Sequence, residues 1–486
     1  MVLPVEPVPI PTVHDEFSYL LGSDTFAHGR LANPTHPMWQ HFETMHEDQI
    51  PKYASIYPPL QGLVLAAGQV ATGTPFTAVW LSAGVMCAVI CWALRGWFSP
   101  GWALLAGAIA AMRLATFSYW GDSYWGGALA ATGGALIFGA LPRVLRSNRR
   151  RDALLAALGV AILANTRPYE GLVFSVAVAL IALPRIGKLR LRTVLPPACA
   201  VLLCAGALMA YYNWRVYGSP TTMPYTVHRH TYGAAQVFIL QPPPPPVIYR
   251  HPEMQEFYAV WERSIYDSAR TWSGFLSNSV GKLYAWWSFF IGPVLTLPLL
   301  ALFATLKSRR SRTLLFLIAV AAVASAQVTF FQPHYIAAAT VVFYAAIVQG
   351  MRALNRWMPK AVRAIPLICA LMIGLRVALA LTSLPEDLRF PETWARSSGM
   401  PIIREELMSR ILEDGGQHLV IVHYSAGHTI HAEYVYNAAD IDASPIVWAR
   451  DMGAEKNAEL LRYFSSRKVW WLDVGEEARL TQYGAK

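Results

Sequence analysis

The sequence predicts a mainly helical membrane protein: a polytopic helix bundle of about ten spans, with outward loops and a small C-terminal α/β domain. The first observation is composition, because 55% of the residues are hydrophobic and only 14% are charged, which is too apolar for an ordinary soluble protein of this length. The second is a series of long apolar segments joined by short polar connections, as expected for helices that cross a hydrocarbon core about 30 Å thick. The third is that Lys and Arg gather in those connections, so the net charge of +10 indicates membrane topology and not nucleic-acid binding.

Three parts of the chain differ in composition. The domains that we expect are an outer loop at 1–60, a transmembrane bundle at 61–382 that includes a long outer loop at 214–282, and a small outer α/β domain at 385–486.

Ten apolar segments are the expected spans. They cover residues 75–95, 101–119, 125–142, 152–166, 169–184, 194–213, 283–306, 313–331, 335–351 and 363–382. The pair at 152–166 and 169–184 is short, so it either crosses at a tilt or forms one hairpin. A further apolar segment, 60–73, is short and contains glycine, and we expect an interfacial or partly buried helix there.

The charge of the connections predicts the orientation. The connections at Arg95, 143–151, 185–192, 307–312 and 352–363 together hold 18 Lys or Arg and no Asp or Glu. The short connections on the other side, at 120–124, 165–169 and 331–334, hold a single Arg. The positive-inside rule therefore puts the outer loop, the loop at 214–282 and the C-terminal domain on the non-cytoplasmic side of what we expect to be a bacterial inner membrane.

The C-terminal part changes from long apolar segments to short alternating elements. Strand-like segments at 418–424, 446–450 and 468–474 alternate with helix-like segments at 401–413 and 453–464. This order predicts a parallel sheet flanked by helices.

The outer loop is polar and loop-like from His14 to Leu60, directly before the apolar tract, and it holds acids, bases and cations. Ionisable groups close to a membrane are costly, so the adjacent carboxylates Asp15 and Glu16 and the cation Lys52 are functional candidates. The alternative for the two carboxylates is that they are ordinary loop residues.

Four histidines of the outer loop could suggest zinc. They are His28, His36, His41 and His46. Their spacing matches no zinc-ligand pattern, so we expect a solvated His-rich loop.

Two ionisable residues lie in or near the second span. Asp122 stands among aromatic residues and glycines at the outer interface, where an aromatic belt explains the Trp and Tyr residues equally well. Arg113 lies inside the span and requires an anion, for which Asp122 or a phosphate would serve. A purely structural pairing of Arg113 is an equal alternative.

Two cationic residues lie at the outer ends of other spans. Arg167 and His334 each stand next to a proline that stops a helix, and Tyr335 follows His334. A helix-end cation facing the same polar layer as Asp15 is what an anionic lipid headgroup requires. Alternatively, Arg167 pairs with Glu170 and His334 is only an interfacial histidine.

Four short motifs together resemble a known enzyme family. They are Asp15-Glu16 in an outward loop, Tyr57-Pro58-Pro59-Leu60 leading into an apolar helix, Arg167-Pro168-Tyr169-Glu170 in a hairpin, and Pro333-His334-Tyr335 at a helix start. The combination, spread over roughly 14–350, resembles the GT-C integral-membrane glycosyltransferases, which include protein O-mannosyltransferases and the lipid A aminoarabinose transferase. The resemblance implies a polyprenyl-phosphate-linked sugar donor, a lipid, glycan or protein acceptor presented from the outer side, and an inverting transfer of a hexosyl or pentosyl group.

The resemblance also implies roles for individual residues. Asp15 matches the catalytic carboxylate and Glu16 its companion, while Arg167 and His334 match donor-phosphate contacts. The family has a spanning helix ahead of the Asp-Glu pair, so we expect an upstream segment of about 20 apolar residues.

The remaining candidates for substrate binding are Lys52, Arg113, Asp122 and Tyr335. A divalent metal is a candidate cofactor, and membrane lipids are expected partners. A transporter and a non-catalytic membrane binding protein are the alternatives to an enzyme. A transporter would bury its ionisable groups near the midplane and often shows repeated halves, whereas the candidates here gather at one face and the sequence shows no repeat.

Overall fold

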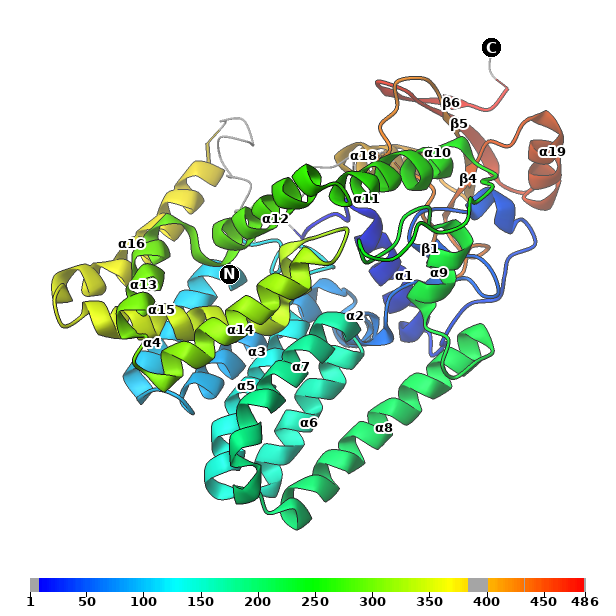
Figure 1. Cartoon of the computed structure of the whole chain (residues 1–486). Coiled ribbons are helices and arrows are strands. Elements are labelled where there is room, and N and C mark those ends of the chain that lie inside the picture. Colours follow the sequence, from blue (N-terminus) through cyan, green and yellow to red (C-terminus); the bar gives the residue numbers. More distant parts are fainter. Residues whose placement is uncertain (1–7, 383–400, 432, 485–486) are drawn as a thin grey trace.

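The computed structural model describes residues 8–382, 401–431 and 433–484, and Figure 1 shows their arrangement. It consists mainly of helices, with one small sheet domain towards the C-terminus, as the sequence predicts. The sheet domain lies on the same side of the bundle as α1 (His14–Ala27) and α9 (Pro224–Tyr232) (Figure 1).

A helix covers each of the ten segments predicted to span. The bundle helices are α2 (Pro59–Thr72), α3 (Phe76–Leu94), α4 (Pro100–Ala110), α5 (Ala128–Ser147), α6 (Arg150–Ala164), α7 (Pro168–Ala182), α8 (Leu191–Tyr217), α12 (Trp272–Trp286), α13 (Gly292–Ala301), α14 (Arg309–Ala326), α15 (Thr340–Leu354) and α16 (Pro359–Ala380). A π-helical turn extends α4 to Ala115, another joins α12 to α13, and a 3-10 turn over Pro333–Ala339 leads into α15.

Seven helical runs of the described chain are long and apolar enough to cross a membrane, by length and composition, which makes this an integral membrane protein. Three predicted spans fall outside that set. The runs through α4 and α6 are shorter, and α14 begins with three arginines within its 18 residues.

The centre of the bundle is formed by α5 and α15, while α8 lies at its edge (Figure 1). Small residues allow the close approach at the centre: a Cβ on Gly134 of α5 would overlap the carbonyl oxygen of Ala338. Helix α8 buries little of its surface, and Leu203 and Leu208 are exposed as expected for side chains that face lipid.

The outer loop differs from its prediction. It begins with helix α1 and contains a short antiparallel pair, β1 (Glu47–Asp48) with β2 (Ala54–Ser55), so the expectation of a loop-like stretch was wrong for its first third. The following α2 is a partly buried helix, as predicted, and it packs its Gly62 edge against α1.

The long outer loop contains α9, then α10 (Pro252–Gln255), a π-helical turn and α11 (Arg263–Ala269). The last three follow one another without a break and form one helical stretch. Helix α9 was not predicted.

The sheet domain contains β3 (His418–Tyr424), β4 (Ile446–Arg450) and β5 (Lys468–Val474), which have the predicted bounds, and β6 (Ala478–Gln482), which was not predicted. The strand order is β4-β3-β5-β6, with β3 parallel to both neighbours and β6 antiparallel to β5. Helix α18 (Pro401–Glu413) packs on one face of the sheet and α19 (Ala454–Tyr463) on the other.

The face that carries α19 is also covered by the outer loop. Leu21, Phe42 and Tyr53 pack in one cluster with Leu419 and Ile421 of β3. The backbone N–H of Ala439 donates to Asp24 at 2.8 Å, and the Tyr53 hydroxyl donates to the carbonyl of Asn437 at 2.9 Å. Because these contacts join residues almost 400 positions apart, the sheet domain and the outer loop form one packed unit.

Candidate active site

Helix α1 begins with two adjacent carboxylates. Val13 is extended and the helix starts at His14, so Asp15 and Glu16 lie in the first turn, where unpaired N–H groups and the helix dipole favour negative charge. Successive side chains of a helix point about 100° apart. The two carboxylates therefore face different surroundings.

Asp15 lies beside a phenol and an imidazole. The Tyr57 hydroxyl donates to one carboxylate oxygen, and His46 Nδ1 lies 3.6 Å from the other. Burial alone would raise the pKa of Asp15, but His46 and the Tyr57 hydrogen bond outweigh burial and hold that pKa well below its usual range. Asp15 is therefore ionised at neutral pH, and its side chain is 18% exposed.

Glu16 points into the protein and bonds to backbone. One oxygen accepts from the N–H of Thr12 at 2.7 Å and from the N–H of Val13 at 3.3 Å, and the other accepts from the N–H of Tyr124 at 3.0 Å. Burial raises the pKa of Glu16 to about 7 even though these bonds favour its charge. Glu16 thus ties the start of α1 to the aromatic loop that also contains the buried Asp122.

Arg167 lies at the other charged end of the site, directly before Pro168 begins α7. Its guanidinium carbon stands 4.4 Å from the centre of the Tyr335 ring, a cation–π contact. The structure therefore brings together two residues that the sequence places at the ends of different spans.

His334 is fully buried beside Tyr335, with their ring centres 5.0 Å apart. The Tyr119 hydroxyl accepts from the backbone N–H of His334 at 3.1 Å and lies 2.9 Å from its Nδ1. We assign the hydroxyl proton to the bond with Nδ1, which puts the ring proton on Nε2. In the described chain Nε2 has no hydrogen-bond partner, which leaves a buried donor for an anion.

Tyrosines connect the two charged ends. Tyr19 of α1 stacks on Tyr57 with ring centres 4.3 Å apart. Burial raises the pKa of Tyr19 to about 12, with the charge of Asp15 adding to this effect and that of Arg167 opposing it. Both charges therefore act on the same ring, and one aromatic cluster separates the carboxylate from the guanidinium.

The structure places two other sequence candidates outside this cluster. Lys52 is exposed on the turn before β2, and within the described residues no hydrogen bond or ion pair joins it to the site. Arg113 donates to the carbonyls of Ser288 and Phe289 and lines a small cavity in the bundle with Gly292.

The four histidines of the outer loop have separate partners. His28 contacts Asp24, His36 contacts Asp442, His41 contacts the carbonyl of Arg450 and His46 contacts Asp15. His36 and His41 are buried, so the expectation of a solvated loop was wrong, because the sheet domain covers this stretch. Within residues 8–382, 401–431 and 433–484, no three His, Cys, Asp or Glu side chains are grouped closely enough to hold a metal ion together.

The direct partners of Asp15 and His334 were not predicted from the sequence. Tyr57 belongs to the Tyr-Pro-Pro-Leu motif and His46 to the histidine group, but neither had a signal that distinguished it from its neighbours. Tyr119 lies in the aromatic loop, where a membrane-interface belt was an equally good explanation.

Comparison with known proteins finds no matching family model and no matching curated protein. Among solved structures, ArnT from Cupriavidus metallidurans in the apo state is similar at 14% identity and a TM-score of 0.46, over 78% of this chain and 60% of that chain. The same protein bound to undecaprenyl phosphate is similar at 14% identity and a TM-score of 0.44, over 79% of this chain and 64% of that chain. This chain thus spans less than two thirds of the length of either structure, and a likeness of this size assigns neither activity nor residues.

Proposed function

We propose that this protein is a membrane glycosyltransferase of the GT-C type, which moves a sugar from a polyprenyl-phosphate-linked donor to a hydroxyl of an acceptor with inversion. The observation that carries the proposal is the site itself. An ionised carboxylate, a guanidinium and a buried imidazole N–H come from three distant parts of the chain and meet around one aromatic cluster.

The chemistry needs these groups and no strong general acid. The acceptor oxygen attacks the anomeric carbon, the bond from that carbon to the phosphate oxygen breaks, and its electron pair leaves with the lipid phosphate. Arg167 and His334 Nε2–H would bind the departing phosphate, since preorganised donors stabilise charge that develops in the transition state. Attack from the face opposite the phosphate inverts the anomeric centre.

Asp15 would accept the proton of the acceptor hydroxyl. Its low pKa makes it a weak base at rest, and a base works best when its pKa is near the working pH. The attacking oxygen becomes strongly acidic as it bonds to carbon, however, so a weak but fully ionised carboxylate can take the proton at that stage. Glu16 would keep Asp15 in place by fixing the start of α1 against Tyr124.

We also propose substrate contacts for Lys52, Arg113 and Asp122. Arg113, whose guanidinium already binds two carbonyls beside a cavity in the bundle, would meet the lipid portion of the donor.

The orientation supports a reaction on the outer side of a bacterial inner membrane. The outer loop packs on the sheet domain and bonds to the long loop, so the three form one unit. The basic connections at 143–151 and 307–312 lie at the opposite ends of the bundle helices. The positive-inside rule places those basic ends in the cytoplasm.

The test uses the purified full chain and a radiolabelled polyprenyl-phosphate sugar. Asp15→Asn keeps the shape and removes the base, so sugar transfer should fall by about 10²–10⁴, whether or not divalent metal is added. Asp267→Asn is the matched control, because it makes the same change at an exposed carboxylate of α11 that pairs with Arg263 of the same helix. Near-normal transfer by Asp15→Asn, or its recovery with excess metal, would exclude Asp15 as the base; no sugar release by the wild type would favour a transporter or a binding protein.

A further inference from the structure

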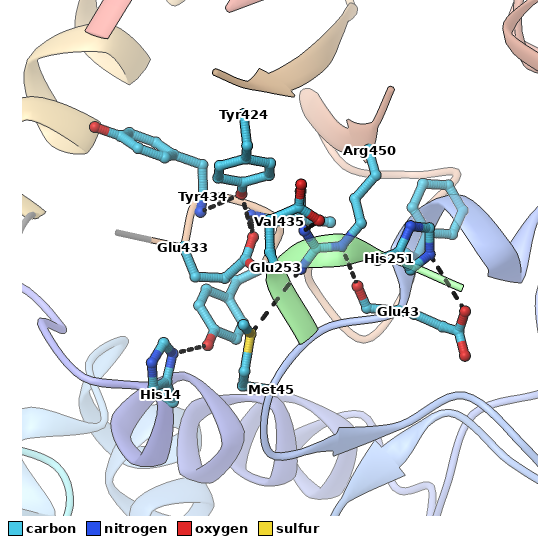
Figure 2. A network of polar contacts seen from close by, with 12 residues as sticks. His14, Glu43, Met45, His251, Glu253, Tyr424, Glu433, Tyr434, Val435 and Arg450 are labelled. Carbon is cyan, nitrogen blue, oxygen red and sulfur yellow. Dashed lines mark hydrogen bonds and ion pairs between the residues drawn. The ribbon is translucent and has the colours of Figure 1, made fainter. Parts of the chain in front are cut away.

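A small cleft lies between the start of α1 and the sheet domain. Its lining includes Thr12, His14, Phe17, Arg404, His431 and Tyr436. In Figure 2, His14 stands on α1 and its ring points toward the strand-linking segment that carries Glu433 and Tyr434. The cleft thus has one wall from the helix that carries Asp15 and one wall from the C-terminal domain.

The acidic side chain of the cleft is already neutralised. Glu433 forms a buried ion pair with Arg450, and its other oxygen accepts from the Tyr424 hydroxyl and from the N–H of Val435 at 2.7 Å (Figure 2). The negative charge of Glu433 is therefore already paired with a cation.

Arg404 supplies a positive charge that no carboxylate of the described chain pairs with. Its guanidinium donates to the carbonyl of Tyr436 at 2.9 Å and stands 5.2 Å from the Phe17 ring and 4.8 Å from the Trp448 ring. Burial lowers the pKa of Arg404 to about 10, so it stays protonated at neutral pH. Its Nε and Nη1 donate to a second carbonyl and to a methionine sulfur, which leaves two of the five guanidinium N–H groups for an anion.

His14 supplies a neutral donor beside that charge. It is 6% exposed, and its Nδ1 lies 2.6 Å from the Tyr436 hydroxyl. We assign the phenol proton to the bond with Nδ1, which puts the ring proton on Nε2. That nitrogen has no partner within the described residues. Burial and then the nearby His46 and His431 lower the pKa of His14, so the ring is uncharged and the positive charge of the cleft belongs to Arg404.

The cleft lies directly beside the proposed base. The His14 ring is 5.7 Å from the ring of His46, whose Nδ1 is 3.6 Å from Asp15. A molecule with an acidic group in the cleft could therefore present a nearby hydroxyl to Asp15.

We propose that this cleft binds an anionic oxygen group, a carboxylate or a phosphate, of the sugar acceptor through Arg404 and His14, and that the C-terminal domain thereby selects the acceptor. That the bound molecule is the sugar acceptor rests on the proposed transfer function, whereas the anion site itself depends only on the two donors, Arg404 and His14.

The test measures anion binding by the purified full chain in a nonionic detergent, without donor or turnover. Sodium phosphate or sodium acetate should raise the Tm by about 2 °C over sodium chloride of the same ionic strength, because a ligand that binds only the folded state stabilises it. Arg404→Gln should abolish the rise. Arg410→Gln, which makes the same change at an exposed position of the same helix, should keep it.

The two salts distinguish the sources of the anionic group. A rise with phosphate alone assigns a phosphate-bearing acceptor, and a rise with acetate assigns a carboxylate-bearing one. If Arg404→Gln does not fold, His14→Phe, which keeps a ring and removes both nitrogens, should lose the rise instead. No rise with either salt, or an unchanged rise in the Arg404 or His14 variant, overturns the proposal, and neither result depends on whether the protein transfers sugar.

Discussion

Replacing Arg450 with methionine should loosen the sheet domain from the outer loop. The Arg450 side chain is 1% exposed and binds three segments at once: it pairs with Glu433, it lies 3.2 Å from Glu253 of α10, and its Nε donates to the carbonyl of Glu43 at 2.6 Å (Figure 2). Methionine fills much of the space but leaves Glu433 as a buried charge without its cation.

The contacts of Arg450 set limits on the free energy that the substitution costs. Removing one partner of a buried, hydrogen-bonded ion pair costs about 3–5 kcal/mol, a range that includes the hydrogen bonds lost with the guanidinium. Glu433 keeps two donors, the Tyr424 hydroxyl and the Val435 N–H, which puts the total near the lower end, about 3 kcal/mol. A cost of this size raises the open population about 100-fold.

Native-state proteolysis of the detergent-solubilised chain measures that population, because cleavage follows opening when closing is fast. Arg450→Met should release C-terminal fragments about 100-fold faster than the wild type. Arg462→Met, at an exposed position of α19, should not. Adding Glu433→Gln to Arg450→Met removes the stranded charge and should recover most of the loss. Equal cleavage rates for the two Arg variants, or no recovery in the double variant, would refute the reasoning.

Two further predictions concern the candidate active site. The folded-state pKa of Glu16, about 7, lies above its ordinary value of 4.5, so its contribution to stability is complete below pH 4.5 and is lost as pH rises through 7. This loss amounts to about 3 kcal/mol. Glu16→Gln should therefore flatten the fall of Tm between pH 5 and pH 8, whereas an unchanged slope would show that other groups cause the fall. In a donor titration, Arg167→Ala should weaken donor use at least tenfold. Tyr335→Ala should weaken it about fivefold through loss of the cation–π contact. Tyr335→Phe keeps the ring, so its donor use should stay near that of the wild type. Wild-type turnover by Arg167→Ala, or an equal defect in Glu170→Gln, would make Arg167 only a structural partner of Glu170.

The sheet domain could be predicted strand by strand because its three parallel strands are apolar runs bounded by polar turns, of which β3 and β4 are largely buried. The strand β6 was missed since only Leu480 of its five residues is buried, so it has no apolar run to recognise. The first helix was missed for a related reason. Its buried positions include Ser18, which bonds to β2, and Gly22 and Ser23, which pack against α2, and together they form no apolar stripe in the sequence.

Arg167 and His334 could be predicted as candidates because prolines mark where α7 and the turn before α15 begin. Cationic residues at such helix ends face the same outer polar layer of the membrane. The partners of Asp15 and His334 could not be predicted. Tyr57, Tyr119 and His46 reach the site only through packing of segments from different parts of the chain, and nothing in their local sequence sets them apart from other interfacial aromatics.

Helix α1 explains why the sheet domain matters to a site that lies mostly on membrane helices. Its first turn sends Asp15 toward Tyr57 and the aromatic cluster, Glu16 toward the loop of Tyr124, and His14 toward Tyr436 of the sheet domain. A rigid helix turn fixes the angles between these side chains, so a shift of the sheet domain that moves His14 also moves Asp15. The docking contacts of the sheet domain therefore position the carboxylate as much as the bundle does, and an acceptor held between His14 and Arg404 would be held by the same element that carries the base.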